Sequence, residues 1–411
     1  MSKRRVVITG MGAITPIGNN KEEMWESIKA GTCGIDTITH YDVAGRKVTL
    51  AAEVKNFVPE EVLDKGEVRK LDPFSMFAIV AANEAIADSG LDFTKEDAMR
   101  CGVMLSSGIG GLGTIQKECE RGLEKGFDRV SPHFIPMSIS NMAAGHIAIK
   151  HGLHGMCSCV VTACAGGTNA IGDAFRQIRD GYQDISVCGG AEASITPLGI
   201  GGFTSMKALS MATDKNRASI PFDKERNGFV MGEGAGVLVL EEYEHAKKRG
   251  ANIYCEVAGY GATCDANHVT APLADGSMAA ACMTIAMEDA GVTPEQVTYI
   301  NAHGTSTSLN DKGETAAVKL AFKDAAKNVM MSSTKSMTGH LLGASGAVEA
   351  MITALSVSND YVPATIHYEV PDENCDLDIV PNEGRHTKVD CAMSHSLGFG
   401  GHNATLVFKK I

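Results

Sequence analysis

The sequence predicts an α/β fold in which helices cover both faces of the sheet. Strand-length apolar runs alternate with stretches of helical periodicity along all 411 residues, which is typical of strand–helix–strand units. Hydrophobic residues make up 44% of the chain and 45 residues are glycine, so the chain can bury a sizeable core and make many tight turns. The pattern of residues 1–250 also begins again in residues 251–411.

The first part of the chain opens with a short β-prone run and then a strongly apolar helix. Met76, Ile79, Val80 and Ile86 recur at helical spacing in that helix. The expected strands are 5–9, 101–107, 159–162, 184–188 and 234–240. The expected helices are 22–29, 73–89, 111–125, 139–150, 241–248 and the one that follows Cys164.

The second part repeats this alternation. The expected strands are 253–259, 297–302, 329–333, 388–394 and 404–408, the last two as a hairpin around 398–401, and the expected helices are 277–290, 311–322 and 339–356. Residues 160–167 with their helix resemble 331–339 with theirs, and 6–18 resemble 257–267. We therefore expect two pseudo-symmetric halves, 1–250 and 251–411, that share one packed interface. The polar, turn-rich stretch 205–232 is the candidate for a lid or an insert.

Composition excludes several classes of protein. The net charge of −12 argues against nucleic acid as a partner. The 12 cysteines show no spacing typical of zinc sites, and in a chain of this size they favour reduced thiols in the cytoplasm. No apolar run approaches the ~18 residues of a membrane span. The apolar run after the basic first residues has only strand length, so no signal peptide is expected.

Cys164 is the candidate nucleophile. A β-prone run leads into it, small residues follow it, and a buried helix comes next, which predicts a sharp strand-to-helix turn. Unpaired N–H groups and the positive end of the helix dipole should lower the thiol pKa there, and the small residues should leave room for a substrate. The alternative is a buried structural cysteine, which is the role expected for Cys157 and Cys159.

Three further motifs combine polar residues with small-residue turns. His303 follows a strand in the run 301–307, Lys335 and His340 lie in the run 333–340, and Phe399 lies between glycines in the loop 394–403. Each motif alone is more typical of structure than of catalysis. Together with Cys164 they favour a catalytic site shared by the two halves.

The glycine-rich run Gly108–Gly113 matches the GxGxxG pattern of dinucleotide-binding proteins. The pattern also requires a second parallel strand that ends in an acidic residue ~20 positions later, and no apolar strand follows here. We therefore expect no nucleotide site. The glycines should instead let the backbone pass close to another chain segment or to an acyl ligand.

These motifs resemble those of the β-ketoacyl-acyl-carrier-protein synthases, in particular their elongating type II branch. The resemblance rests on Thr162–Cys164, His303–Thr307, Lys335–His340 and Gly398–Gly401, and it extends over the full chain, including 221–229 and 408–411. It implies the thiolase fold, with two βαβαβαββ halves in five αβαβα layers. It also implies a homodimer without a cofactor that takes acyl and malonyl groups from an acyl carrier protein.

The resemblance also implies a role for each matching residue. Cys164 would carry the acyl chain as a thioester, while His303 and His340 would polarise the malonyl thioester as it loses CO₂. Lys335 would set the local field and orient Glu349 or His303. The substrate site would further comprise the backbone N–H groups of Cys164 and Phe399 as an oxyanion hole, Phe399 as a gate, Ile109 as the residue that sets the depth of the acyl pocket, and Thr305 and Thr307.

Two expectations concern charged ligands. Some relatives hold a monovalent cation near the positions of Asn301, Glu349 and Ser394, but His395 stands where the family usually has asparagine and argues against it. An acidic carrier protein needs a basic face on this acidic chain. The candidates are Lys65, Arg69, Lys70 and Arg129; the alternative for each is an ordinary solvated residue.

Related activities remain as alternatives. A thiolase would share the fold but needs a second cysteine as acid and base, and Cys391 lacks the small-residue setting of Cys164. A chain-length-factor-like subunit would lack the nucleophile. A ketosynthase of a polyketide-type pathway is the closest alternative, because it differs mainly in its pocket and its partner.

Overall fold

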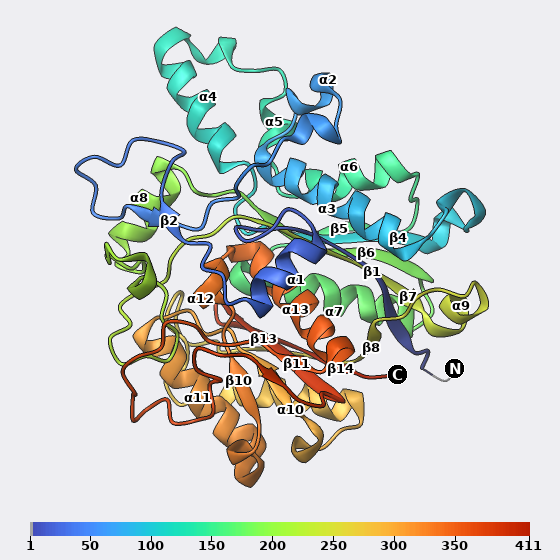
Figure 1. The fold of residues 1–411 in the computed structure, drawn as a ribbon. Coiled ribbons are helices and arrows are strands. Elements are labelled where there is room, and N and C mark those ends of the chain that lie inside the picture. The colour runs from blue at the N-terminus through green and yellow to red at the C-terminus, as the bar shows by residue number, and fades with distance from the viewer. Residues whose placement is uncertain (1–2) are drawn as a thin grey trace.

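Ten strands form one sheet that runs through the whole molecule (Figure 1), in the order β10-β9-β13-β14-β8-β1-β7-β6-β4-β5. The computed structural model describes residues 3–411, so the first two residues of the expected first half lie outside the described range. The strands of the first half are β1 (Val6–Ile14), β4 (Cys101–Ser106), β5 (Cys157–Val160), β6 (Ile185–Glu192) and β7 (Gly234–Glu242). Those of the second half are β8 (Cys255–Cys264), β9 (Tyr299–Asn301), β10 (Met330–Ser332), β13 (Cys391–Gly398) and β14 (His402–Lys409). Two small two-stranded sheets pair β2 (Asp36–Thr37) with β3 (Leu50–Ala51) and β11 (Tyr361–Val362) with β12 (Arg385–His386).

The strand order repeats along the chain. In both β5-β4-β6-β7-β1 and β10-β9-β13-β14-β8 the strands follow the order third, second, fourth, fifth, first of that part of the chain. The two first strands, β1 and β8, join the sets by antiparallel pairing of Val6 with Val257 and Ile8 with Cys255. This repeated order supports the proposal of two similar halves.

Helices lie in three layers around the strands (Figure 1). Helices α3 (Pro73–Ser89) and α6 (Met142–His151) cover the outer face of the first set, and α10 (Ser277–Ala290) with α11 (Ser308–Phe322) covers the second. Between the two sets lie α7 (Gly166–Arg179) and α13 (Ser345–Asn359), which contact strands of both. The remaining helices are α1 (Lys21–Lys29), α2 (Lys65–Val68), α4 (Leu112–Lys125), α5 (Phe134–Ser138), α8 (Pro197–Ser205), α9 (Tyr243–Lys248) and α12 (Lys335–Thr338). The helix-covered α/β architecture expected from the sequence is therefore present.

Glycines let the two central helices approach each other and the strands. A Cβ atom on Gly167 would lie 2.6 Å from the backbone nitrogen of Ala347 in α13, and one on Gly172 would lie 2.4 Å from the ring of Tyr260. A Cβ atom on Gly166 would lie 2.0 Å from the hydroxyl of Ser106. The glycines after Cys164 therefore serve close packing, and the expectation that they leave room for a substrate is wrong.

Several local predictions are also wrong. The helix expected at 339–356 begins late: α13 begins only at Ser345, and His340 lies on the turn between α12, which ends at Thr338, and α13. Cys157 is exposed and Cys159 half-buried, because β5 is the last strand of the sheet and not part of the core. Helices α5 and α8 were not expected, and the helix expected at 139–150 begins at Met142.

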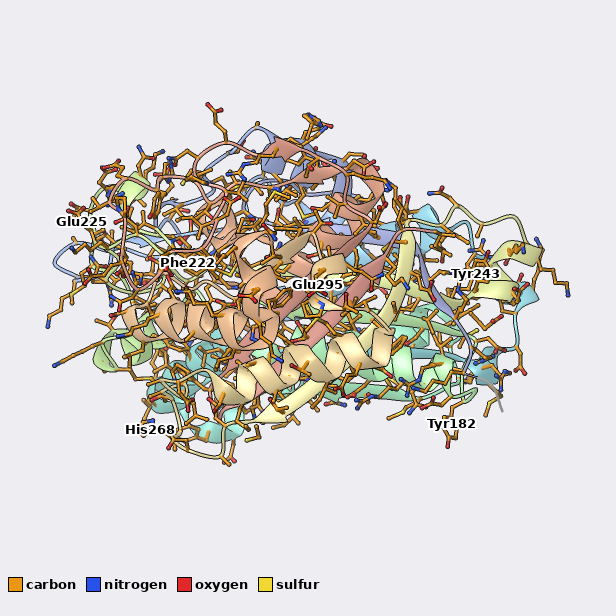
Figure 2. The ribbon with its side chains drawn as sticks, turned by 90° about the horizontal axis from the view of Figure 1, so that it is seen from below. Tyr182, Phe222, Glu225, Tyr243, His268 and Glu295 are labelled. Atoms are coloured by element: carbon orange, nitrogen blue, oxygen red, sulfur yellow. The ribbon has the colours of Figure 1, made fainter. Side chains whose placement is uncertain are left out.

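The stretch 205–232 packs against the second half. Ile220 N–H donates to the hydroxyl of Ser306 and the Ser219 hydroxyl donates to the carbonyl of Lys335. Phe222 is fully buried, and Figure 2 shows it inside the molecule while Glu225 lies at the edge. This packing shows an insert and contradicts a free lid. Among residues 3–411 no helix has the length and apolar character needed to cross a bilayer.

Candidate active site

Cys164 lies in a short 3-10 turn, Ala163–Ala165, between β5 and the first residue of α7. The expected strand-to-helix turn is confirmed. The side chain is buried, with 9% of the residue exposed. The backbone ahead of it is strained, because Ala163 has a φ of 49°, a left-handed conformation that costs a non-glycine residue about 1–3 kcal/mol.

The same strain recurs beside the two histidines. Ser306, three residues after His303, has a φ of 68°, and Leu342, two residues after His340, has a φ of 48°. Left-handed non-glycine residues gather at functional sites, where the surrounding structure holds them in place. Nine other non-glycine residues of 3–411 also have a positive φ, so the strain accompanies these three positions without identifying the site by itself.

The thiol of Cys164 has a raised pKa, contrary to the expectation from its place near a helix start. Burial raises the pKa to about 12, and the charge of Glu192 adds to this effect. The charge of Lys335 and the backbone N–H groups of Phe399 and Cys164 lower the pKa, but they do not outweigh burial. In the unliganded protein the sulfur is therefore a thiol, because desolvation penalises the ionised form.

Cys164, His303 and His340 line one cavity of about 100 Å³. The rings of His303 and His340 stand nearly perpendicular, with centroids 5.2 Å apart and an interplanar angle of 86°. The other lining residues include Phe203, Phe229, Thr305, Thr307 and Phe399. The structure thus brings together the nucleophile and the two imidazoles that the sequence placed in different halves.

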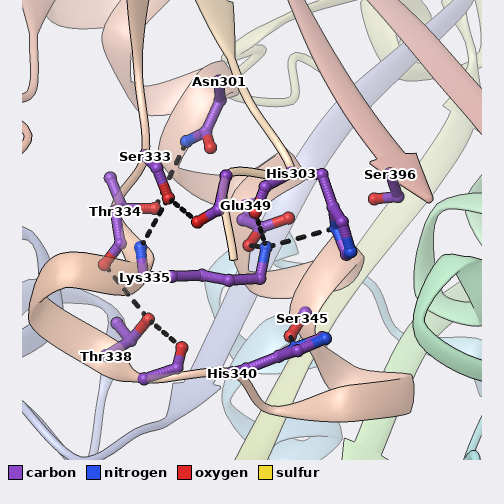
Figure 3. A network of polar contacts seen from close by, with 12 residues as sticks. Asn301, His303, Ser333, Thr334, Lys335, Thr338, His340, Ser345, Glu349 and Ser396 are labelled. Atoms are coloured by element: carbon purple, nitrogen blue, oxygen red, sulfur yellow. Dashed lines mark hydrogen bonds and ion pairs between the residues drawn. The ribbon is translucent and has the colours of Figure 1, made fainter. Parts of the chain in front are cut away.

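Lys335 fixes the tautomer of His303 (Figure 3). Its ammonium lies 3.4 Å from Nδ1 of His303, donates to the carbonyl of His303 at 2.6 Å and is paired with Glu349. Because an ammonium can only donate, Nδ1 is the acceptor and the ring proton of neutral His303 is on Nε2. Lys335 thus contacts both residues that it was expected to orient.

His340 has the same tautomer for a different reason. The N–H of Leu342 donates to Nδ1 of His340 at 3.3 Å, and the hydroxyl of Ser345 lies 2.8 Å from the same atom. Burial, followed by the charge of Lys335, holds the pKa of both imidazoles well below its usual value. The site therefore holds two neutral rings, each with an Nε2–H that can donate to a developing oxyanion.

Glu314, which the sequence did not single out, shapes the His303 turn. Its carboxylate accepts the N–H groups of His303 and Gly304, each at 2.7 Å, and burial raises its pKa to about 8. One sequence signal could have identified Glu314: it is an acidic residue on the apolar, buried face of α11, beside Ala317 and Val318.

Phe399 lies on the turn that connects β13 and β14, at the tip of this hairpin. Gly400 and Gly401 follow it with φ values of 87° and 79°, conformations that favour glycine. The ring of Phe399 lies 6.3 Å from that of Phe203, centroid to centroid, in the wall of the cavity. Its N–H group and that of Cys164 both lower the pKa of the Cys164 thiol.

The other expected residues divide into two groups. Thr305 and Thr307 line the cavity, with their hydroxyls 2.9 Å apart, and Ile109 packs against the apolar cluster that contains Cys164. The four docking candidates are exposed and lie outside the cavity; they are Lys65, Arg69, Lys70 and Arg129.

Three buried oxygens have no hydrogen-bond partner among residues 3–411: Oδ1 of Asn301, Oε2 of Glu349 and the hydroxyl of Ser394. Asn301 and Ser394 are register partners in β9 and β13, and α13, which carries Glu349, packs on both strands. Nε2 of buried His395 also has no partner, while its Nδ1 lies 2.7 Å from the hydroxyl of Thr405. Within residues 3–411 no cluster of three or more His, Cys, Asp or Glu side chains could hold a metal ion.

Curated relatives match the whole chain. The 3-oxoacyl-(acyl-carrier-protein) synthase 2 of Synechocystis sp. is 51% identical over 411 residues, which is 100% of this chain and 99% of that protein. The protein of the same name from Staphylococcus aureus (strain COL) is 52% identical over 407 residues, with 99% and 98% covered.

Solved structures match as well. A type II polyketide synthase acyl-carrier protein in complex with its ketosynthase bound to the hexaketide has a TM-score of 0.92 at 36% identity, and 100% of each chain is covered. A Beta-ketoacyl synthase from Burkholderia phymatum has a TM-score of 0.91 at 34% identity, with 99% and 100% covered. The expected thiolase-type fold is therefore confirmed.

Family descriptions divide the chain into two matched regions. Residues 3–246 match the family "Beta-ketoacyl synthase, N-terminal domain" and residues 254–369 match "Beta-ketoacyl synthase, C-terminal domain". The matched regions, the full-length relatives and the convergence of Cys164, His303 and His340 in one cavity agree. This chain belongs to the beta-ketoacyl synthase family.

Proposed function

We propose that this protein lengthens an acyl chain by two carbons through a decarboxylative condensation with a malonyl group, both delivered by an acyl carrier protein in fatty-acid synthesis. The observation that carries the proposal is the shared cavity of Cys164 and two neutral imidazoles. A thiol can accept an acyl group, and paired Nε2–H donors can stabilise the enolate that decarboxylation produces.

In the first half-reaction Cys164 attacks the thioester carbonyl of the acyl-carrier protein. The new carbon–sulfur bond to Cys164 forms, the bond to the carrier sulfur breaks, and the carrier leaves as a thiol with the proton that Cys164 loses. The N–H groups of Cys164 and Phe399 would donate to the oxygen of the tetrahedral intermediate. Because burial raises the thiol pKa to about 12, the proton has to leave as attack occurs, and it ends on the departing carrier sulfur.

In the second half-reaction malonyl-carrier protein loses CO₂. The carbon–carbon bond to the carboxylate breaks, and its electron pair forms an enolate whose oxygen accepts from Nε2–H of His303 and His340. The enolate carbon then attacks the carbonyl of acyl-Cys164, and the carbon–sulfur bond breaks to return the thiolate, which takes up a proton. Lys335 assists by fixing the tautomer of His303 and by keeping its pKa low.

Sequence similarity favours this reaction over one in a polyketide pathway. The chain shares 51–52% identity with the curated 3-oxoacyl-(acyl-carrier-protein) synthases and 36% with the polyketide ketosynthase of the carrier-protein complex.

Phe399 would act as a gate, because its glycine turn can reorient when Cys164 is acylated.

The test is incubation with a mass-tagged long-chain acyl-carrier protein and malonyl-carrier protein. Wild type should form acyl-Cys164 and release a product longer by two carbons, while Cys164→Ala should form neither. Exposed Cys119 supplies the matched control, since Cys119→Ala should retain both activities. A Cys164→Ala variant that still condenses at the wild-type rate would refute the proposal.

The orphaned oxygens of Asn301, Glu349 and Ser394 suit a monovalent cation, which prefers such ligands. Nδ1 of His395 is hydrogen-bonded to the hydroxyl of Thr405. The His395 ring makes no hydrogen bond to these three oxygens in the structure. Bound there, the cation would support the negative charge of Glu349 beside Lys335. We infer that the three residues would hold it despite the histidine.

We also propose a homodimer. β5 is the last strand of the sheet, so one edge of its backbone is free to pair with another strand. Large apolar side chains are exposed on either side of β5 and along the segment from α4 to α6, namely Leu123, Phe127, Ile135, Ile149, Met156 and Val161. Such surfaces mark interaction sites. Sedimentation should give twice the 43.2 kDa of the chain, and Val161→Asp should shift it toward the monomer.

Carrier docking on the face formed by Lys65, Arg69, Lys70 and Arg129 is part of the proposal. These cations are exposed, and an acidic partner would complement them. The cysteine pattern of the sequence supports a cytoplasmic location.

A further inference from the structure

Glu192 ends β6 and is fully buried. Its carboxylate accepts five hydrogen bonds. Oε2 accepts the N–H of Gly108 at 2.7 Å and of Gly343 at 3.0 Å; Oε1 accepts the N–H of Ile109 at 3.3 Å and the hydroxyls of Ser107 and Ser194, each at 3.2 Å.

Four of these donors come from two segments with different tasks in the proposed reaction, and the fifth, Ser194, follows β6. Gly108 and Ile109 belong to the loop after β4, and Ile109 packs against the apolar cluster that contains Cys164. Gly343 belongs to the turn Leu342–Ala344, whose Leu342 N–H fixes the tautomer of His340. The two segments touch: a Cβ atom on Gly343 would lie 2.3 Å from the nitrogen of Gly108.

Burial raises the pKa of Glu192, while the N–H groups of Gly343, Gly108 and Ile109 lower it because they favour the ionised form. Backbone N–H groups can only donate, and a carboxylate with both oxygens occupied by donors is favoured over the acid. A buried charge is costly to fold, and an apolar side chain of similar volume often serves stability as well. The charge of Glu192 also reaches the sulfur of Cys164, where it raises the thiol pKa.

We propose that Glu192 is a positioning residue that holds the acyl-pocket loop of Ile109 and the His340 turn in one geometry. The proposal rests on the proposed function. The N–H groups of the Ile109 loop and of Gly343 donate to the same carboxylate. An acyl chain that displaces Ile109 therefore also shifts the His340 turn. In this way Glu192 links acyl-chain selection to malonyl decarboxylation. Neither Glu192 nor Gly343 has to touch the substrate for this effect.

Glu192→Gln tests the link because the amide keeps the shape but presents one NH₂ group to N–H donors. Two quantities are measured: the ratio of kcat/KM for hexadecanoyl- over octanoyl-carrier protein, and the decarboxylation rate of malonyl-carrier protein per alkylatable Cys164. We expect the ratio to change by about threefold or more and the decarboxylation rate to fall about tenfold, as expected for lost hydrogen bonds to a charged group. The chain-length ratio is independent of the fraction of protein that folds.

Glu84→Gln is the matched control. Glu84 also accepts two backbone N–H groups, those of Ala13 and Lys21, but it contacts neither segment. Should Glu192→Gln be insoluble, Ser194→Ala decides, since it removes one donor and keeps the carboxylate; it should change both quantities in the same direction by a smaller factor.

An unchanged chain-length ratio overturns the inference, even where overall activity falls. A purely structural defect would lower kcat/KM by the same factor for both acyl-carrier proteins. Equal decarboxylation in Glu192→Gln and Glu84→Gln overturns it as well. If wild type itself neither condenses nor decarboxylates, the proposed function fails instead, so the two failures are distinguishable.

Discussion

Replacing Lys335 by methionine should release His303 from its fixed tautomer and slow decarboxylation. Methionine keeps the length and burial of the side chain but removes the ammonium that lies 3.4 Å from Nδ1 and 2.6 Å from the carbonyl of His303. A hydrogen bond from a charged donor contributes about 1.5–3 kcal/mol. Its loss corresponds to a fall of roughly 10- to 100-fold in the rate of malonyl decarboxylation.

The variant should still fold because Glu349 can take up a proton. Burial already raises the pKa of Glu349 to about 7 from its usual value near 4.5, and the charge of Lys335 counteracts that rise. Without Lys335 the folded-state pKa is higher still. A folded-state pKa above the unfolded one means that stability is greatest below the unfolded pKa and is lost as pH rises through the folded pKa. The Tm of Lys335→Met should therefore fall between pH 6 and 9 by more than that of wild type.

Two measurements decide this prediction. Selective ¹⁵N labelling of histidine reports the tautomer of His303, and CO₂ release from malonyl-carrier protein reports decarboxylation. Lys21→Met is the control, since Lys21 is also buried and paired, with Asp88 at 2.6 Å. If Lys335→Met keeps the Nε2–H tautomer of His303 and decarboxylates as fast as wild type, the assigned role of Lys335 is wrong.

Three further outcomes are expected. Alkylation of Cys164 followed by peptide mapping should accelerate about tenfold per pH unit from pH 7 to 10 without a plateau, because the thiol pKa is raised to about 12; a plateau near neutral pH would show a stable thiolate. Ile109→Phe should shorten the preferred acyl chain in competition assays, since Ile109 packs against the apolar cluster that contains Cys164, and an unchanged preference would count against its role. Reversing Lys65 and Arg69 to Glu should raise KM for acyl-carrier protein, more so at low salt, whereas an equal KM would exclude this docking face.

Much of the fold was predictable because its elements follow local rules. The helices at Pro73–Ser89 and Ser277–Ala290 have the bounds that their periodicity indicates, and Asp72 and Gly90 cap the first of them. Cys164 at a strand-to-helix turn was predictable for the same reason. The break at His340 was not, since Leu342 adopts a left-handed conformation that only the surrounding packing enforces.

The alternation of strands and helices, the small-residue turns and the residue types of the site follow from the amino-acid sequence, because these features depend on neighbours within a few positions. Tertiary structure alone decided the thiol pKa, the tautomers and the role of Glu192. Lys335 and His303 are 32 residues apart in the chain, and Glu192 and Gly343 are 151 apart. Charge, burial and hydrogen bonding act through space, so residues that no local pattern connects set the chemistry of the site.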